Sequence, residues 1–166
     1  MKRRQAEGNQ TTAEARAVRV FIAEANSHFG ETIRQVLANH RDCAIVGEAA
    51  TLQEATLGLA TASPDLVLLD LNLLPTGGLK VLRQLARHLP HARIAVLLSD
   101  YTPEYRAAAR VHGAFYCIGK DHLEEHLAWI IADARADLRG RQGASLTDPR
   151  EESKWARERK STGSTG

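Results

Sequence analysis

Hydrophobic and polar residues follow one pattern five times along this chain. Each time, a short and continuous apolar run is followed by a polar loop, and then by a segment in which apolar residues recur every three or four positions. Continuous apolar runs bounded by turn residues are typical of strands buried on both faces of a parallel sheet, and the three-to-four spacing is typical of amphipathic helices. The five predicted strands span residues 18–23, 44–48, 65–70, 93–98 and 115–118.

A helix is predicted after each of these strands, and three of the helices have recognisable start signals. Thr51, with Glu54 three residues later, fits a capping box. Thr102 before Pro103 fits the start of the fourth helix, and Asp121 is expected to cap the fifth. The predicted helices span residues 27–39, 51–62, 78–88, 102–112 and 121–138. Five strands alternating with five helices predict an α/β fold with a five-stranded, doubly wound parallel sheet.

The distribution of charge divides the chain into one domain and two tails. Residues 18–138 are expected to form the domain, with a disordered tail at 1–17 and a basic, polar tail at 139–166. The predicted domain holds 11 Lys and Arg against 14 Asp and Glu, whereas the tails carry net charges of +2 and +3. The whole chain has a net charge of +2, which does not by itself indicate a nucleic-acid-binding protein.

Several classes of protein are disfavoured by simple features of the sequence. No run of 18 apolar residues is present, so we expect no membrane-spanning helix and no membrane partner. The basic residues after Met1 are not followed by the apolar segment that a signal peptide needs. Cys43 and Cys117 lie in apolar runs without CxxC spacing, so both are expected to be reduced core thiols. Together these features favour a cytoplasmic protein.

Three charged residues stand directly at or after the ends of predicted strands. Glu24 follows the first strand, Asp70 ends the third, and Lys120 follows the fifth. In open α/β sheets, ligands bind beyond the carboxyl ends of the strands. Two carboxylates and an ammonium group there suit Mg²⁺ and phosphate, and an aspartate so placed can act as a nucleophile toward a phosphoryl group.

Five segments around these positions carry a family resemblance. They are Val20–Glu24, Val46–Ala49, Pro64–Asn72, Gly78-Leu79, and Gly113-Ala114 with the later Lys120-Asp121. Together they resemble the receiver domain of bacterial two-component response regulators, most closely the subfamily that usually carries a helix-turn-helix output domain. The resemblance covers about residues 18–138 and is most specific in the run that ends at Asn72. It implies a flavodoxin-like (βα)5 fold and a role in phosphorelay signalling.

The resemblance also implies roles for four residues. Asp70 would be the phosphoacceptor, and Glu24 would be the first member of the acidic pair that holds Mg²⁺. The backbone carbonyl of Asn72 would be a further metal ligand, and Lys120 would contact the phosphoryl group.

Three positions depart from the family pattern. Ala25 stands where the family has its second acid. Counting back from Lys120, the place of the family's Ser or Thr at the end of the fourth strand falls on Leu98, with Ser99 one residue late. A one-residue shift in a strand turns the side chain to the other face, so Ser99 is expected to be a poor substitute. The family's switch aromatic, three residues before the lysine, is here Cys117.

These departures predict weak or absent Mg²⁺ binding and a degraded phosphate site at Asp70. Ligand charge sets the affinity of a site for hard cations, and a lost hydroxyl removes a hydrogen bond to an anion. The first hypothesis is therefore a receiver or pseudo-receiver that is not an enzyme. It would bind a sensor histidine kinase or another signalling protein, or a second copy of itself, through the face formed by the fourth helix, the fifth strand and the fifth helix.

Two other hypotheses are less favoured. The alternative is a small Mg²⁺-dependent phosphatase or phosphotransferase with Asp70 as nucleophile, but position 72, two residues on, is Asn rather than an acid. A DNA-binding regulator is the other hypothesis. Because nothing after residue 138 has the pattern of a helix-turn-helix, specific DNA binding is not expected.

Overall fold

Five parallel strands form the centre of the molecule in the order β2-β1-β3-β4-β5. A computed structural model of the 166-residue chain describes residues 16–75 and 77–142. All four strand pairings are parallel. The strands are β1 (Val18–Ala23), β2 (Cys43–Ala49), β3 (Leu66–Asp70), β4 (Arg93–Leu98) and β5 (Tyr116–Gly119). The predicted α/β class and doubly wound parallel sheet are therefore confirmed.

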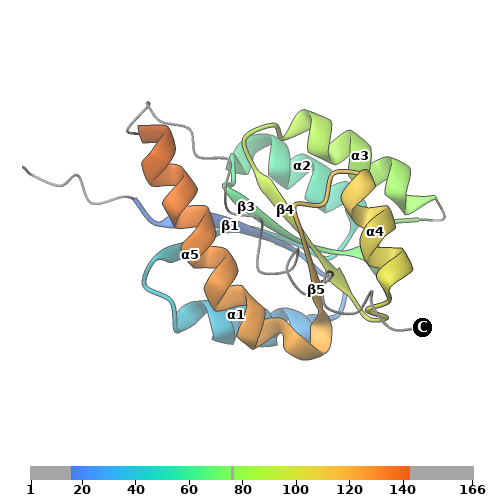
Figure 1. The fold of residues 1–166 in the computed structure, drawn as a ribbon, viewed down its shortest axis with the longest axis horizontal. Coiled ribbons are helices and arrows are strands. Elements are labelled where there is room, and N and C mark those ends of the chain that lie inside the picture. The colour runs from blue at the N-terminus through green and yellow to red at the C-terminus, as the bar shows by residue number, and fades with distance from the viewer. Residues whose placement is uncertain (1–15, 76, 143–166) are drawn as a thin grey trace, which may run out of the picture.

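Helices cover both faces of this sheet. The helices are α1 (Ser27–Ala38), α2 (Leu52–Ala62), α3 (Gly78–His88), α4 (Pro103–Val111) and α5 (Leu123–Gln142), with 3₁₀ turns η1 (Leu71–Leu73) and η2 (Lys120–His122). Figure 1 shows α1 and α5 on one face of the sheet and α2, α3 and α4 on the other. Because helices cover both faces, the central strand β3 is apolar on both sides until its last residue, whereas the edge strand β2 has exposed positions.

The hydrophobic core therefore has two parts, one on each face of the sheet. Side chains such as Ile22 and Leu68 pack toward α1 and α5, whereas their neighbours Phe21 and Leu69 pack toward α2, α3 and α4. All five residues of β3 are buried. This central strand carries its last residue, Asp70, to the carboxyl end of the sheet without any exposed position on the way.

The helix starts agree with the sequence at two of three places. Both hydrogen bonds of the Thr51–Glu54 capping box are present, and the Thr102 hydroxyl accepts a hydrogen bond from the Tyr105 N–H. The prediction that Asp121 caps the fifth helix is wrong. Asp121 lies inside η2, and α5 begins after that turn at Leu123. The helix also ends at Gln142, four residues beyond the predicted end.

Most of the two predicted tails, residues 1–15 and 143–166, lies outside the described residues. Arg16 is described, and its guanidinium pairs with both oxygens of the Asp65 carboxylate at 2.6 and 2.8 Å. In the part of the chain that the structure describes, no helix is long and apolar enough to cross a membrane.

Candidate functional site

Glu24, Asp70 and Lys120 meet at the carboxyl-terminal edge of the sheet. Lys120 Nζ lies 2.8 Å from Oε2 of Glu24 and 3.1 Å from Oδ2 of Asp70. The side chains of Glu24 and Asp70 are 1% and 4% exposed, and that of Lys120 is 17% exposed. The sequence prediction that these three groups converge is borne out, and two buried carboxylates share one ammonium group.

Strand order explains why a lysine makes this contact. Asp70 ends β3 and Glu24 follows the neighbouring β1, but Lys120 follows β5, which is separated from β3 by β4. Adjacent strands are about 4.8 Å apart, so β3 and β5, which lie on either side of β4, are roughly 10 Å apart. A long side chain is needed to cover that distance, and its four methylene groups can lie along the edge of the sheet while the ammonium group reaches the acids.

Backbone N–H groups orient the two carboxylates. Oε1 of Glu24 accepts a hydrogen bond from the Asn26 N–H, and Oδ1 of Asp70 accepts one from the Asn72 N–H, each at 3.0 Å. Each acid therefore presents one oxygen to its own loop and the other to Lys120. Burial raises the pKa of Glu24, although the hydrogen bonds from Lys120 and from the Asn26 N–H act in the opposite direction.

Phe29, on α1, is a contact of the site that the sequence did not reveal. Lys120 Nζ lies 4.7 Å from the centre of the Phe29 ring, in the geometry of a cation–π interaction. The spacing of apolar residues along α1 marks Phe29 only as a core residue, and it does pack against the α1 and α5 side of the core. No pattern in the sequence indicates its second role as a support for the ammonium group.

Ser99 lies beside the loop that follows Asp70. Leu98, the last residue of β4, is buried in the core on the α2, α3 and α4 side. Ser99 comes after the strand, so the alternation of side chains along β4 does not apply to it. Its Oγ accepts a hydrogen bond of 3.0 Å from Nδ2 of Asn72. A hydroxyl group is therefore present beside the loop that follows Asp70, and the expectation that Ser99 is a poor substitute for the family's Ser or Thr stays a prediction.

The acidic pair is incomplete in the structure as in the sequence. Ala25 is exposed directly after Glu24 and offers no oxygen ligand. Within residues 16–75 and 77–142, no group of three or more His, Cys, Asp and Glu side chains is placed to hold a metal ion. Two buried carboxylates and a backbone carbonyl are nevertheless ligands of the kind that Mg²⁺ prefers, so the donor set fits this cation with one charged ligand fewer.

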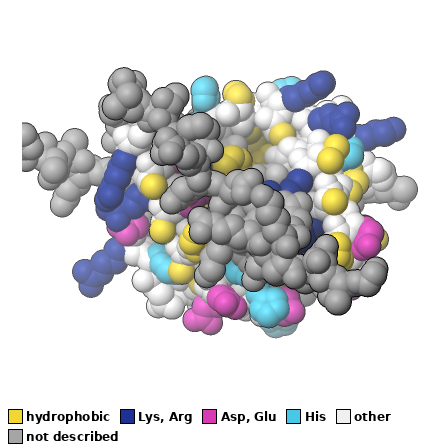
Figure 2. All heavy atoms as spheres, viewed as in Figure 1, with side chains coloured by type: hydrophobic (Ala, Val, Ile, Leu, Met, Phe, Trp, Pro, Cys, Tyr) yellow, Lys and Arg dark blue, Asp and Glu magenta, His cyan; other side chains and the backbone are white. Residues whose placement is uncertain are grey.

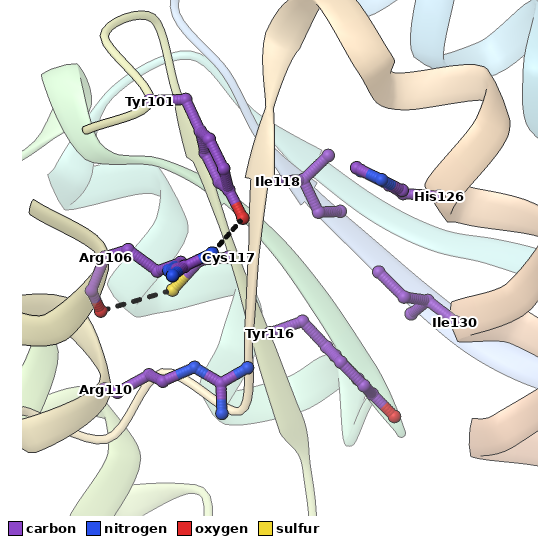
Figure 3. A pocket seen from close by; sticks show the side chains of 8 residues that line it. All are labelled: Tyr101, Arg106, Arg110, Tyr116, Cys117, Ile118, His126 and Ile130. Carbon is purple, nitrogen blue, oxygen red and sulfur yellow. Dashed lines mark hydrogen bonds between the residues drawn. The ribbon is translucent and has the colours of Figure 1, made fainter. Parts of the chain in front are cut away.

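Cys117 and Tyr116 point to opposite faces of the sheet (Figure 3). Cys117 is directed toward α4, where its Sγ lies 3.8 Å from the Arg106 carbonyl oxygen, and burial raises the pKa of the thiol. Tyr116 is directed toward α5, where its hydroxyl donates to the Asp133 carboxylate. Tyr116 therefore does not replace an aromatic side chain at position 117. Tyr101, from the loop before α4, lines the same pocket as Cys117.

Comparison with known proteins gives these features a context. Residues 20–132 match the family model of the response regulator receiver domain. The DNA-binding transcriptional activator DevR/DosR of Mycobacterium tuberculosis is 29% identical over 133 residues, which are 80% of this chain and 58% of the activator. The transcriptional regulatory protein YhcZ of Bacillus subtilis is 31% identical over 110 residues, 66% of this chain and 51% of that protein. The chain thus spans little more than half the length of these relatives.

Solved structures agree on the fold. The signal receiver domain of the response regulator NarL of Mycobacterium tuberculosis superposes with a TM-score of 0.65 at 21% identity, over 73% of this chain and 98% of that one. The isolated receiver domain of RcsB from Salmonella enterica serovar Typhimurium gives a TM-score of 0.66 at 20% identity, over 72% and 89% of the two chains. With the family match over residues 20–132, these findings show that the chain belongs to the response regulator receiver domain family of two-component signalling.

Proposed function

We propose that Asp70 accepts a phosphoryl group from a sensor histidine kinase in the cytoplasm, in a site that Ala25 weakens for Mg²⁺. The observation that carries the proposal is the setting of the Asp70 carboxylate. It is buried at the end of the central strand, one oxygen is held by the Asn72 N–H, and the other is paired with Lys120 at 3.1 Å. A carboxylate held in this way is oriented for attack on an incoming phosphoryl group.

The transfer exchanges one bond to phosphorus for another. An oxygen of the Asp70 carboxylate forms a bond to phosphorus while the bond between phosphorus and the donor's leaving atom breaks, and the leaving group departs with the electron pair. Lys120, already 3.1 Å from the attacking carboxylate, can stabilise negative charge on the transferred oxygens. Glu24 holds the ammonium group from the other side, 2.8 Å away.

Receiver domains typically bind Mg²⁺, which supplies positive charge to the phosphoryl oxygens. In this chain Asp70, Glu24 and the backbone carbonyl of Asn72 would hold it. Without a second acid at Ala25, one carboxylate fewer offsets the charge of the cation, and Glu24 is already engaged with Lys120. We therefore propose that phosphorylation of Asp70 requires more Mg²⁺ than it would in a site with both acids.

The test is phosphorylation by acetyl phosphate with Mg²⁺, followed by intact mass. We expect one phosphoryl adduct on the wild-type protein and none on Asp70→Asn. Asp121→Asn is the matched control, because Asp121 is an exposed aspartate at the same edge of the sheet, and this variant should keep the adduct. No adduct on the wild type would disprove phosphoacceptor activity. Steady turnover of a simple phosphate ester would instead favour the phosphatase or phosphotransferase alternative.

The partner-binding part of the proposal concerns α4 and the start of β5. Tyr105 and Val111 on α4, and Phe115 before β5, are among the large hydrophobic side chains exposed in the described part of the chain. Exposed apolar side chains are available for contact with other proteins. We propose that a partner protein or a second copy of the chain binds here, and that Val111→Glu weakens the association in size-exclusion chromatography or pull-down with the kinase.

A further inference from the structure

Asn72 contacts both the phosphoacceptor and the nearby hydroxyl group. Its backbone N–H donates to Oδ1 of Asp70, and its side-chain amide donates to Oγ of Ser99, each at 3.0 Å. Asp70 ends β3 and Ser99 follows β4, so one residue of η1 connects the two loops that border the site. The resemblance to receiver domains implies a role only for the backbone carbonyl of Asn72, and the side chain has no role assigned by it.

The direction of the hydrogen bond between Asn72 and Ser99 decides whether the Ser99 hydroxyl can still donate its proton. Because Nδ2 of Asn72 donates, Oγ of Ser99 uses a lone pair and keeps its own proton for another acceptor. Ser99 is exposed and lies outside β4, so the strand does not fix its side chain. Without Asn72 the hydroxyl would turn freely among its rotamers and hydrogen-bond to water.

We propose that Asn72 is a positioning residue, whose side-chain amide holds the Ser99 hydroxyl so that its proton is donated to a phosphoryl oxygen on Asp70. The proposal rests on the proposed function, since it concerns the same phosphoryl group. Ser99 forms no covalent bond and loses no proton in this role. Hydrogen bonds from a fixed donor to developing negative charge are stronger than those from a donor that must first be ordered.

Substitutions at Asn72 separate its side chain from its backbone. Asn72→Ala removes the amide but keeps the N–H that binds Asp70 and the carbonyl that is implied as a metal ligand. Asn72→Asp keeps the shape but has only acceptor oxygens, so it draws the Ser99 proton toward itself and away from the phosphoryl group. Asp100→Ala, at an exposed position next to Ser99, is the matched control.

The experiment is a double-mutant cycle on the rate of Asp70 phosphorylation by acetyl phosphate, measured by intact mass. We expect Ser99→Ala to be slower by about tenfold, the effect of one hydrogen bond to a charged group. Asn72→Ala should be slower than wild type, Asn72→Asp slower still, and Asp100→Ala unchanged. The double variant Asn72→Ala/Ser99→Ala should be no slower than Ser99→Ala alone, because the amide acts only through the hydroxyl.

The outcomes that overturn the proposal are distinct from failure of the proposed function. If Asn72→Ala has no effect, or slows phosphorylation by the same factor with and without Ser99, the amide does not act through the hydroxyl although Asp70 is still a phosphoacceptor. If the wild-type protein takes up no phosphoryl group, the proposed function fails, and the role of Asn72 fails with it.

Discussion

The individual residues of the site are held by a small number of short-range contacts. Each buried carboxylate accepts a hydrogen bond from one backbone N–H and pairs with the Lys120 ammonium group. The same ammonium group faces the Phe29 ring. Two carboxylates against one ammonium leave an excess of negative charge in a buried place. Burial of unbalanced charge is unfavourable, so this site should respond strongly to an added cation or to a proton.

Ala25→Asp tests the missing acid. A carboxylate beside Glu24 would give Mg²⁺ another charged ligand, so we expect affinity to rise about tenfold, equivalent to ~1.4 kcal/mol. Half-maximal phosphorylation of Asp70 by acetyl phosphate should then require correspondingly less Mg²⁺ in a titration read by intact mass. Ala25→Asn adds a side chain of the same size without charge and is the control. Equal Mg²⁺ requirements for the wild type and Ala25→Asp would show that Ala25 does not limit the site.

Glu24 should make stability depend on pH. Burial raises its pKa above the ordinary value of 4.5, so the folded chain binds this proton more tightly than the unfolded chain does. The contribution of Glu24 to stability is therefore greatest below about 4.5 and is lost as the pH rises through the raised pKa. We expect the free energy of unfolding of the wild type, relative to Glu24→Gln, to fall as the pH rises from about 4.5 through the raised pKa of Glu24, and then to level off.

Urea unfolding of both proteins at a series of pH values measures this difference. Two stability curves that stay parallel from acid to neutral pH would contradict a raised pKa at Glu24.

At the scale of elements, the sequence predicts those strands and helix caps that depend on residues close together along the chain. The apolar runs located all five strands, and the Thr51 and Thr102 caps are correct because capping is a contact between residues two or three positions apart. The predicted cap at Asp121 is wrong, and the contact of Ser99 could not be predicted, because both depend on where an element ends. The short turn η2 takes the place expected for the first turn of α5, and β4 stops one residue before Ser99. The contact between Asn72 and Ser99 joins two loops and leaves no trace in the spacing of either.

Packing between α2 and β1 leaves no room for a larger side chain at one glycine of α2. Gly58 in α2 faces the buried Phe21 ring of β1, and an added Cβ would lie 2.8 Å from two ring carbons. Alanine favours a helix by about 1 kcal/mol over glycine, but overpacking in a core costs about 1–3 kcal/mol. We expect Gly58→Ala to lower the free energy of unfolding despite the gain in helix propensity.

Gly140 in α5 provides the matched control. An added Cβ there meets no atom within 4 Å, so Gly140→Ala should stabilise the protein by up to about 1 kcal/mol. Combining Gly58→Ala with Phe21→Leu should cost less than the sum of the two single changes, since the smaller side chain makes room. Chemical denaturation of the four variants measures these values. Equal stabilisation by the two alanines would contradict the contact with Phe21.

Considered as a whole, the molecule places its chemistry at one edge of a sheet whose two faces are fully occupied by helices. Acidic and histidine side chains gather along the lower edge of the view in Figure 2, over α1 and the start of α5. Among the residues that the structure describes, Leu138 on α5 is the last one that is buried in the core. The domain limit predicted from the change in composition after residue 138 stays a prediction, and α5 itself continues to Gln142.

Two truncations separate the folded domain from the sequence that follows it. We expect removal of residues 143–166 to change the free energy of unfolding by no more than about 0.5 kcal/mol, because the described residues alone supply core side chains for both faces of the sheet. Truncation after Asp137, only five residues shorter, also removes Leu138, whose burial is worth about 1.5–3 kcal/mol. Urea denaturation of both proteins should show a sharp loss of stability between the two end points. If removing residues 143–166 already costs as much as the shorter truncation, those residues belong to the folded unit and the domain does not end with α5.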